Sequence, residues 1–339
     1  MIIVSASDTR YLPGLFVTWA SILASTTNAR IVFHLLHDGI PSQNMEELES
    51  SLRNIGEHFE LITHLLDNTL FDNFPEFFSD SKMTYARLLI PKIIDAPKIL
   101  YIDTDLVCTR DFSDIWGLDL DSNVAAVVRE FGYQGEEDSH LFVEEYPNIK
   151  EHTYFNGGLL LLNLDRIRKE GLFDLALEHL ETDKEKCLYW DQSVLNVVFA
   201  NKCKYLPPSC NFQLNRHQNI TADKLALLTE GEANLHYVTD SKPWIKANSS
   251  LHHRIFKLAD GRFRRDDSLV QTAFDWTAAK QSRRRHQLAA LKLRFLAFLG
   301  WRKERNQRIA QDHLRLANQL ASDLRNQALV DSTFQQLFL

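Results

Sequence analysis

Two carboxylates stand one residue apart at the end of an apolar run, in the segment KILYIDTDLVC at 98–108. Ionised aspartate is rarely left inside a protein without a partner, because removing it from water is costly. Asp103 and Asp105 follow a predicted buried strand, and ligands of open α/β sheets gather at the carboxyl ends of strands. Two carboxylates there can hold one divalent cation and leave positions open for phosphate oxygens. The alternative is a strand-end pair that caps a turn.

The Asp-x-Asp spacing is weak by itself, since a second copy, Asp119 and Asp121, lies in a polar turn to which we assign no chemistry. An EF-hand loop is excluded because its sixth position requires glycine and here holds Cys108. The haloacid-dehalogenase pattern of phosphatases also fits Asp103 and Asp105 and stays as an alternative. That pattern usually follows the first strand of its domain and needs a later acidic pair at a strand end. The only Asp-Asp pair, at 266–267, lies in a polar segment.

Four further motifs place binding groups near other predicted element ends. VSASD ends the first strand with small residues and Asp8, which leaves room for a flat base or a ribose. MTYARLLIP puts Arg87 on a helix, as a fixed cation suited to phosphate or carboxylate. YFNGGLLLLNLD opens a strand with Asn156 and two glycines, which lets a ligand approach the main chain closely. LHYVTDSKPW offers His236 as an imidazole ligand and Lys242 as a charge for phosphate. Each motif alone also fits a purely structural role.

The elements that must position these residues alternate along the chain. Apolar runs rich in Ile, Val and Leu predict buried strands, and helical patterns lie between them, so we expect an α/β sheet with helices on both faces. The predicted strands are 2–7, 30–37, 59–66, 98–103, 124–129 and 157–164. The predicted helices cover about 14–26, 43–57, 82–94 and 165–182. No G-x-G-x-x-G follows the first strand, which argues against a dinucleotide dehydrogenase.

Charge is unevenly distributed over the 339 residues, whose formal net charge is −7. From Trp276 onward there are twelve Lys or Arg and four Asp or Glu, so this segment carries about +8 and residues 1–275 about −15. An acidic body argues against nucleic acid as the main partner. The basic segment predicts a helix with Leu288, Leu291 and Phe295 on one stripe, together with Leu299, and a second helix after Trp301.

This basic segment has two interpretations, a helical hairpin or dimer contact that packs, and a helix that lies on an anionic membrane surface. We predict a catalytic domain over 1–255, a connecting segment over 256–275 and a basic helical region over 276–339.

The four cysteines show no CxxC pair and no zinc-binding spacing, so we predict free thiols in a reducing compartment. They are Cys108, Cys187, Cys203 and Cys210. The N-terminus has no signal-peptide pattern, and no apolar stretch is long enough to span a bilayer. We therefore expect a cytoplasmic protein, with the basic segment as a possible peripheral contact on the inner face of the cytoplasmic membrane.

In their order, SASD, TYAR, YIDTD, YFNGGLLLLNL, WDQSVLN and HYVTDSKPW resemble glycosyltransferase family 8, the retaining enzymes of the GT-A fold. The resemblance covers about residues 1–255 and extends to bacterial lipopolysaccharide and lipooligosaccharide galactosyl- and glucosyltransferases and to glycogenin. It implies a mixed, mostly parallel central sheet flanked by helices. It also implies transfer of galactose or glucose from a UDP-sugar to a glycan acceptor, such as lipopolysaccharide core or another lipid-linked glycan.

The resemblance implies a role for each candidate site residue. The ligands of a divalent ion, Mn2+ or Mg2+, would be Asp103, Asp105 and His236. Uridine and ribose contacts would fall on Ala6, Asp8 and Thr104. The residues around the donor hexose would be Arg87, Asp103, Asn156, Gly157, Asp191 and Gln192, and the diphosphate would meet Lys242. The predicted catalytic pair is Asp191 and Gln192, and the predicted acceptor-side residues are Glu130 and Tyr189.

Two departures from the family pattern accompany these roles. Thr239 followed by Asp240 stands where the family commonly has glycine, in a loop that closes over the diphosphate. Glu130 replaces an aspartate that faces the acceptor in a relative. Glu130 indicates a different acceptor, whereas the Thr239–Asp240 departure is the one feature that favours a second alternative, a non-catalytic UDP-sugar-binding protein. Because the resemblance places Gln192 nearest the anomeric carbon and an amide is a poor nucleophile, we predict front-face attack rather than double displacement.

Overall fold

The computed structural model describes residues 1–75, 81–130, 154–214, 232–238, 242–245, 251–274 and 276–325. The chain divides into two compact units, which are described separately. The first comprises 1–215 and 231–240, and the second comprises 216–230 and 241–339. The boundaries predicted at 255 and 275 stay a prediction.

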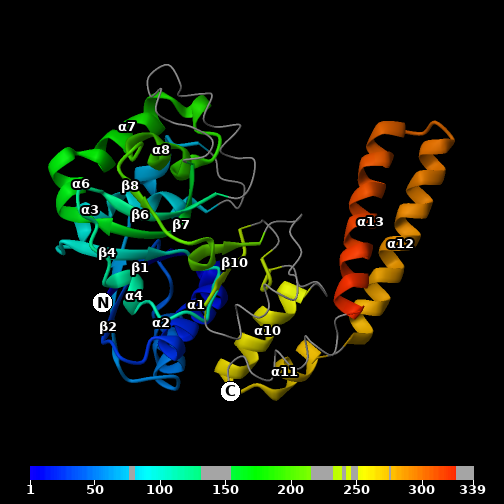
Figure 1. Cartoon of the computed structure of the whole chain (residues 1–339), viewed down its shortest axis with the longest axis horizontal. Coiled ribbons are helices and arrows are strands. Elements are labelled where there is room, and N and C mark those ends of the chain that lie inside the picture. The colour runs from blue at the N-terminus through cyan, green and yellow to red at the C-terminus, as the bar shows by residue number, and fades with distance from the viewer. Residues whose placement is uncertain are drawn as a thin grey trace. The chain divides into compact units, whose positions relative to one another are not determined.

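The first unit contains a seven-stranded sheet in the order β3-β2-β1-β4-β7-β6-β8 (Figure 1). Its strands are β1 (Ile2–Ser7), β2 (Ile31–His37), β3 (Phe59–Leu65), β4 (Lys98–Ile102), β6 (Ala125–Arg129), β7 (Phe155–Asn163) and β8 (Cys203–Tyr205). β7 runs antiparallel to β4 and β6, and the other pairings are parallel. The predicted mixed, mostly parallel sheet is confirmed, and each of the six predicted strands matches within two residues.

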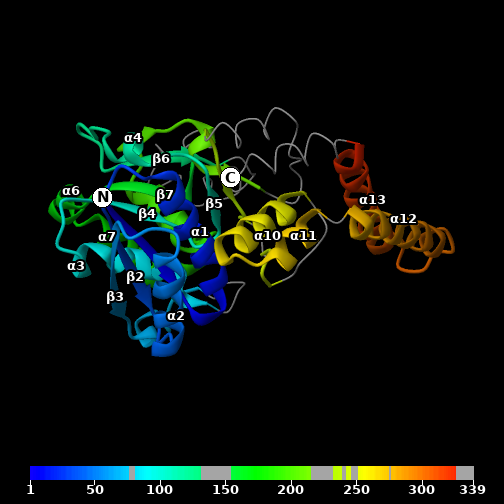
Figure 2. The same ribbon diagram turned by 90° about the horizontal axis from the view of Figure 1, so that it is seen from below.

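Helices cover both faces of this sheet (Figure 2). The longer ones are α1 (Leu12–Ser25), α2 (Ser42–Arg53), α6 (Leu164–Glu170), α7 (Leu172–Thr182) and α8 (Trp190–Val198). Short elements are α3 (Ile90–Ile93), α4 (Ser113–Trp116) and the 3-10 helices η1 (Thr9–Tyr11), η2 (Asn68–Phe71), η3 (Lys82–Leu89), η5 (Lys184–Lys186) and η6 (Pro208–Asn211). The helix predicted over 165–182 is two helices, because Gly171 adopts φ +64° and ends α6.

The core follows the alternation of side chains along the strands. Val4 of β1 faces a large apolar cluster that includes residues of η3, α7 and α8. Ser5 points to the opposite face, where its hydroxyl accepts a hydrogen bond from Trp19 Nε1 of α1 at 3.1 Å. The Trp19 ring stacks on Phe33 of β2, with ring centroids 4.4 Å apart. The central strands are therefore buried on both sides, as their continuous apolar runs predict.

A second, three-stranded sheet was not predicted from the sequence. Its order is β5 (Leu106–Cys108), β10 (Asn234–His236) and β9 (Phe212–Gln213), all too short to give a period-2 pattern. Hydroxyl groups of α1 bind the free edge of β5. Thr18 Oγ1 lies 3.0 Å from Leu106 N and 2.9 Å from Leu106 O, and Ser21 Oγ accepts from Cys108 N at 2.9 Å. α1 thereby fixes the chain that follows Asp105.

The described helices of the second unit are α10 (Leu251–Arg264), α11 (Asp267–Phe274), α12 (Trp276–Phe298) and α13 (Lys303–Arg325). α12 and α13 lie side by side as a helical hairpin (Figures 1 and 2), which confirms the predicted helical C-terminal tail. Asp266 Oδ1 accepts a hydrogen bond from Ser268 N at 2.9 Å at the start of α11. The acidic pair 266–267 is thus a helix cap and not the strand-end pair that a dehalogenase-type phosphatase requires.

The four cysteines are free thiols. Within the described parts of the chain, we find no helix whose length and hydropathy together suffice to cross a bilayer.

Candidate active site

The two aspartates lie where the chain passes from the large sheet to the small one. β4 ends at Ile102, and Asp103 N continues its ladder with β7 by donating to the Gly158 carbonyl at 2.9 Å. β5 begins at Leu106, directly after Asp105, which is 6% exposed. Both side chains therefore stand on a backbone that is hydrogen-bonded immediately before and after them.

His236 reaches the aspartates because the small sheet pairs two distant segments. β10 is antiparallel to β5, which places His236 opposite Leu106, and Tyr237 N donates to the Asp105 carbonyl at 3.0 Å. His236 Nε2 lies 3.0 Å from Asp105 Oδ1 and 3.8 Å from Asp103 Oδ2. Among the described residues, these three form the one group whose possible metal-ligating atoms lie within 4.8 Å of one another.

A hydrogen bond to Asn211 determines which nitrogen of His236 faces the carboxylates. His236 Nδ1 lies 2.8 Å from Asn211 Oδ1, an atom that can only accept, so the proton resides on Nδ1. In the neutral imidazole Nε2 then presents its lone pair toward oxygens of Asp103 and Asp105. An imidazole lone pair and two carboxylate oxygens form a donor set that fits a divalent ion.

A chain of amide contacts continues from Asn211 into the predicted donor pocket. Asn211 Nδ2 donates to Asn156 Oδ1 at 2.8 Å, and the same oxygen accepts from Gly158 N at 3.0 Å. Asn156 Nδ2 donates to Glu130 Oε2 at 2.9 Å and to Gln192 Oε1 at 3.3 Å. The imidazole is therefore connected through two amides to Glu130 and Gln192.

Arg87 is the buried cation of the site, at 6% exposure. Its Nη2 donates to Asp103 Oδ1 and its Nε lies beside Asp191 Oδ2, both at 2.9 Å. Its Nη1 donates to the Gly157 carbonyl at 2.5 Å, and its guanidinium lies 4.3 Å from the centroid of the Tyr101 ring. Burial works to lower the pKa of Arg87, but Asp103 and Asp191 outweigh it and raise that pKa. Arg87 thus joins two predicted site carboxylates.

Burial raises the pKa of Asp191, which is 3% exposed, although Arg87 and Thr84 act in the opposite direction. Thr84 Oγ1 donates to Asp191 Oδ1 at 2.5 Å. Gln192 lies beside Asp191 in the first turn of α8, and its Oε1 accepts from Gly157 N at 2.9 Å. Asp191 is therefore held by side chains, whereas Gln192 is held by the main chain of β7.

The two glycines of β7 make room for side chains of the site. A Cβ at Gly157 would lie 2.9 Å from Arg87 Nη1. A Cβ at Gly158 would lie 2.1 Å from His236 Cε1 and 2.9 Å from Asp103 Oδ2. Arg87 and His236 therefore lie against these two glycines, and the expected approach of a ligand to this main chain stays a prediction. The contact of Gly157 with the donor hexose stays a prediction.

The remaining predicted site residues lie in different local structures. Ala6 lies one residue before the end of β1, and Thr104 is buried between the two aspartates. Asp8 Oδ1 accepts from the main-chain nitrogens of Arg10 and Tyr11, which makes Asp8 the cap of η1. Tyr189 N donates to Ser193 Oγ at 2.8 Å at the start of α8. Lys242 belongs to the second unit, and Thr239 and Asp240 lie outside the described residues.

Three residues of the site were missed in the sequence. Tyr101 OH donates to Asp103 Oδ1 at 2.9 Å, Thr84 contacts Asp191, and Asn211 orients His236. The period of two along a strand could have identified Tyr101, because it shares a face with Asp103. Thr84 lies three residues before Arg87 in the quoted motif. Asn211 gives no signal, since it ends a 3-10 helix next to a two-residue strand.

The family model of glycosyl transferase family 8 matches residues 2–248. The chain belongs to glycosyl transferase family 8. A putative glycosyltransferase of Haemophilus influenzae is 25% identical over 285 residues, which cover 81% of this chain and 82% of that protein. The lipopolysaccharide 1,3-galactosyltransferase of Salmonella typhimurium is 23% identical over 242 residues, covering 70% of this chain and 71% of the relative.

Among solved structures, the galactosyltransferase LgtC in complex with donor and acceptor sugar analogs superposes with a TM-score of 0.62 at 27% identity. The match covers 77% of this chain and 95% of LgtC. The predicted GT-A fold and the predicted transferase class are confirmed, so this family 8 chain is a glycosyltransferase. Enzymes of the fold usually use a divalent metal ion, and among the residues that the structure describes the Asp103, Asp105 and His236 cluster is the group that could hold one.

Proposed function

We propose that this glycosyltransferase moves galactose or glucose from a UDP-sugar to a lipid-linked glycan, with a divalent ion and with retention of the anomeric configuration. The observation that carries the proposal is the convergence of Asp103, Asp105 and a correctly oriented His236 at the carboxyl end of β4. The relative from Salmonella is a lipopolysaccharide galactosyltransferase, and this supports a lipopolysaccharide-like acceptor.

Asp103, Asp105 and His236 would hold the ion, Mn2+ or Mg2+. When bound, such an ion acts as a Lewis acid that stabilises negative charge on a departing diphosphate. Asp103 Oδ1 is occupied by Arg87 and Tyr101, which leaves Oδ2 directed toward His236. Arg87 and Tyr101 therefore fix the carboxylate before any donor arrives, and preorganised ligands need no rearrangement during the reaction.

The contacts of Asp191 and Gln192 favour a front-face reaction. Both oxygens of Asp191 are directed at other side chains, Thr84 and Arg87, so this carboxylate is not placed to attack a sugar carbon. Gln192 is fixed by the main chain of β7, and its amide is a poor nucleophile. In the proposed step an acceptor oxygen bonds to the anomeric carbon as the carbon–phosphate oxygen bond breaks. The departing phosphate oxygen takes the acceptor proton.

A screen of UDP-sugars tests this function, first by donor hydrolysis with Mn2+ and then with lipid-linked glycan acceptors. We expect one UDP-hexose to be consumed, the activity to disappear with EDTA and to return with Mn2+, and proton NMR to show a retained anomeric configuration in the product. Full activity in excess EDTA, or an inverted product, would contradict the proposal. Binding of UDP without consumption of any UDP-hexose would favour the non-catalytic alternative.

A further inference from the structure

The large apolar side chains of α12 point outward from the helical hairpin. Leu288, Leu291, Phe295 and Phe298 are 62%, 72%, 61% and 85% exposed, and their spacing of three or four residues places them on one stripe. Leu299 and Trp301 extend the stripe into the turn at 61% and 55% exposure. A stripe of this kind normally faces a core, and here it faces away from the partner helix.

Small side chains form the contact between the two helices. Ala290 and Ala297 of α12 are 1% and 4% exposed, and they occupy the face opposite the apolar stripe. Among the described side chains of α13, the buried ones are Ala310, Ala317 and Ala321 together with Leu320 and Asn306. Small side chains therefore make up much of the contact between the helices, while the exposed side chains of the stripe lie outside it.

Basic side chains flank the apolar stripe, and no Asp or Glu occurs from Trp276 to Phe298. Arg284 lies on the line of the stripe, Arg285 and Lys292 lie along one edge, and Arg294 lies along the other, as the 3.6-residue period dictates. All four are exposed. The nearest carboxylates in sequence are Asp275, directly before Trp276, and Glu304, beyond the turn in the first turn of α13.

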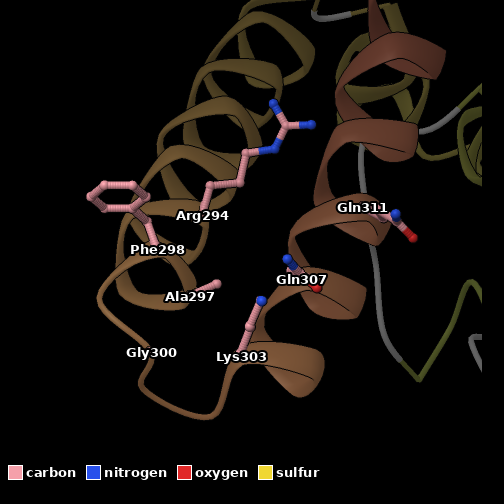
Figure 3. A pocket seen from close by; sticks show the side chains of 7 residues that line it. All are labelled: Arg294, Ala297, Phe298, Gly300, Lys303, Gln307 and Gln311. Atoms are coloured by element: carbon pink, nitrogen blue, oxygen red, sulfur yellow. The ribbon is translucent and has the colours of Figure 1, made fainter.

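A cleft of about 610 Å3 opens at the tip of the hairpin, next to the end of the stripe. Its lining residues are Arg294, Ala297, Phe298, Gly300, Lys303, Gln307 and Gln311 (Figure 3). Figure 3 shows Arg294 and Lys303 entering this gap from different helices, while Phe298 points away from α13. The turn itself is ordered by Gly300, at φ +79°, and by a hydrogen bond from Trp301 N to the Leu296 carbonyl at 3.1 Å.

We propose that the outward stripe of α12 and the basic tip of the hairpin dock on an anionic phospholipid bilayer. Phe298 and its neighbours would enter the acyl boundary, and Arg294 and Lys303 would meet headgroup phosphates. A second copy of the chain is the weaker occupant, because a symmetric dimer pairs the same patch twice and would bring like charges together. The proposal adds a membrane partner to the proposed function, but it does not depend on transferase activity.

Vesicle flotation of the full-length protein tests the proposal. We use vesicles of phosphatidylcholine alone and vesicles that also contain phosphatidylglycerol. We expect binding to the anionic vesicles, weakened by salt and at least about tenfold weaker on the neutral ones. Replacing Arg284, Arg285, Lys292 and Arg294 by Gln should lower the anionic partition coefficient by about 600-fold, since each of the four basic residues contributes about fivefold.

A second variant separates the apolar contribution. Replacing Leu291, Phe295 and Phe298 by Ser should also abolish most binding, by at least about tenfold, without changing helix content. The matched control replaces Leu65 and Leu70 by Ser, because these side chains of the first unit are 71% and 56% exposed and should not matter for lipid. UDP-sugar hydrolysis should be the same in all of these variants.

Three results would overturn the docking proposal. These are no binding of the wild type to anionic vesicles, equal binding to neutral vesicles, and unchanged binding of the Ser variant. A wild-type dimer that the Ser variant converts to a monomer would assign the stripe to a second copy instead. A chain that floats with anionic vesicles but consumes no UDP-sugar would refute the proposed function and leave the docking proposal intact.

Discussion

Around β4, charged and amide side chains are buried and held by one another, whereas along α12 large apolar side chains are exposed and alanines are buried. Arg87 is 6% exposed and forms ion pairs with Asp103 and Asp191. Phe298 is 85% exposed, one residue from the buried Ala297. Buried charges and exposed large apolar side chains are both unfavourable for folding by itself. The first region therefore suits a small charged ligand, and the second suits an extended apolar surface.

The largest effect is expected when a carboxylate is removed from the cluster of Asp103, Asp105 and His236. Asp105→Asn should lower UDP-sugar turnover by at least about a thousandfold and abolish detectable Mn2+ binding by titration calorimetry. Thermal unfolding should not shift downward, because the change removes a buried negative charge that has a cation as its natural partner.

The second Asp-x-Asp provides the matched control. Asp121 is an exposed turn residue with φ +50°, a conformation that asparagine tolerates, and its side chain pairs with Lys204 on the surface. Asp121→Asn should leave turnover and Mn2+ binding unchanged. Equal behaviour of the two variants would refute the assignment of the buried cluster as a metal site.

A change at Gly158 tests the packing of the same cluster without altering a charge. In Gly158→Ala the new Cβ would lie 2.1 Å from His236 Cε1, so the imidazole must move. We expect Mn2+ affinity to fall by about a hundredfold and the free energy of unfolding by about 1–3 kcal/mol. Gly117→Ala is the control, since its Cβ would meet the Ser113 carbonyl at 3.2 Å, far from any predicted ligand. Normal Mn2+ affinity in Gly158→Ala would show that His236 is not a ligand.

A smaller effect is expected at Asn211, because its side chain contacts the predicted ligand His236 and would not contact the ion. Asn211→Ala removes the acceptor of His236 Nδ1 and should weaken Mn2+ binding by about 10- to 100-fold. Asn211→Asp keeps that acceptor but loses the donor to Asn156 Oδ1. It should bind Mn2+ almost normally and show a raised KM for the UDP-sugar. If both variants lose Mn2+ affinity equally, the hydrogen bond to the imidazole is not what orients it.

The strands and helices that have long, periodic patterns could be predicted from the sequence. Six of the seven strands of the large sheet, the end of β4 before Asp103 and the two tail helices follow from apolar runs and period, whereas the three-residue β8 was not predicted. The small sheet could not be predicted, because strands of two or three residues carry no period. Asn211 was missed with it, since the contact with His236 exists only after β9 and β10 pair. The glycines of β7 were recognised, but the groups that fill the space beside them became clear only from the structure.

The smallest effects are expected in the hairpin. There a substitution at a buried position should lower stability, and one at the neighbouring exposed position should leave it almost unchanged. Ala297→Leu inserts a larger side chain between two closely packed helices and should reduce the stability of the hairpin by about 1–3 kcal/mol. Phe298→Ser, one residue further, removes an exposed ring and should leave that stability within about 0.5 kcal/mol. Hydrogen exchange of α12 and α13 amides in the full chain measures both, with UDP-sugar hydrolysis unchanged. A larger loss in Phe298→Ser than in Ala297→Leu would mean that the apolar stripe is buried in solution, and the contrast between the two regions would then fail.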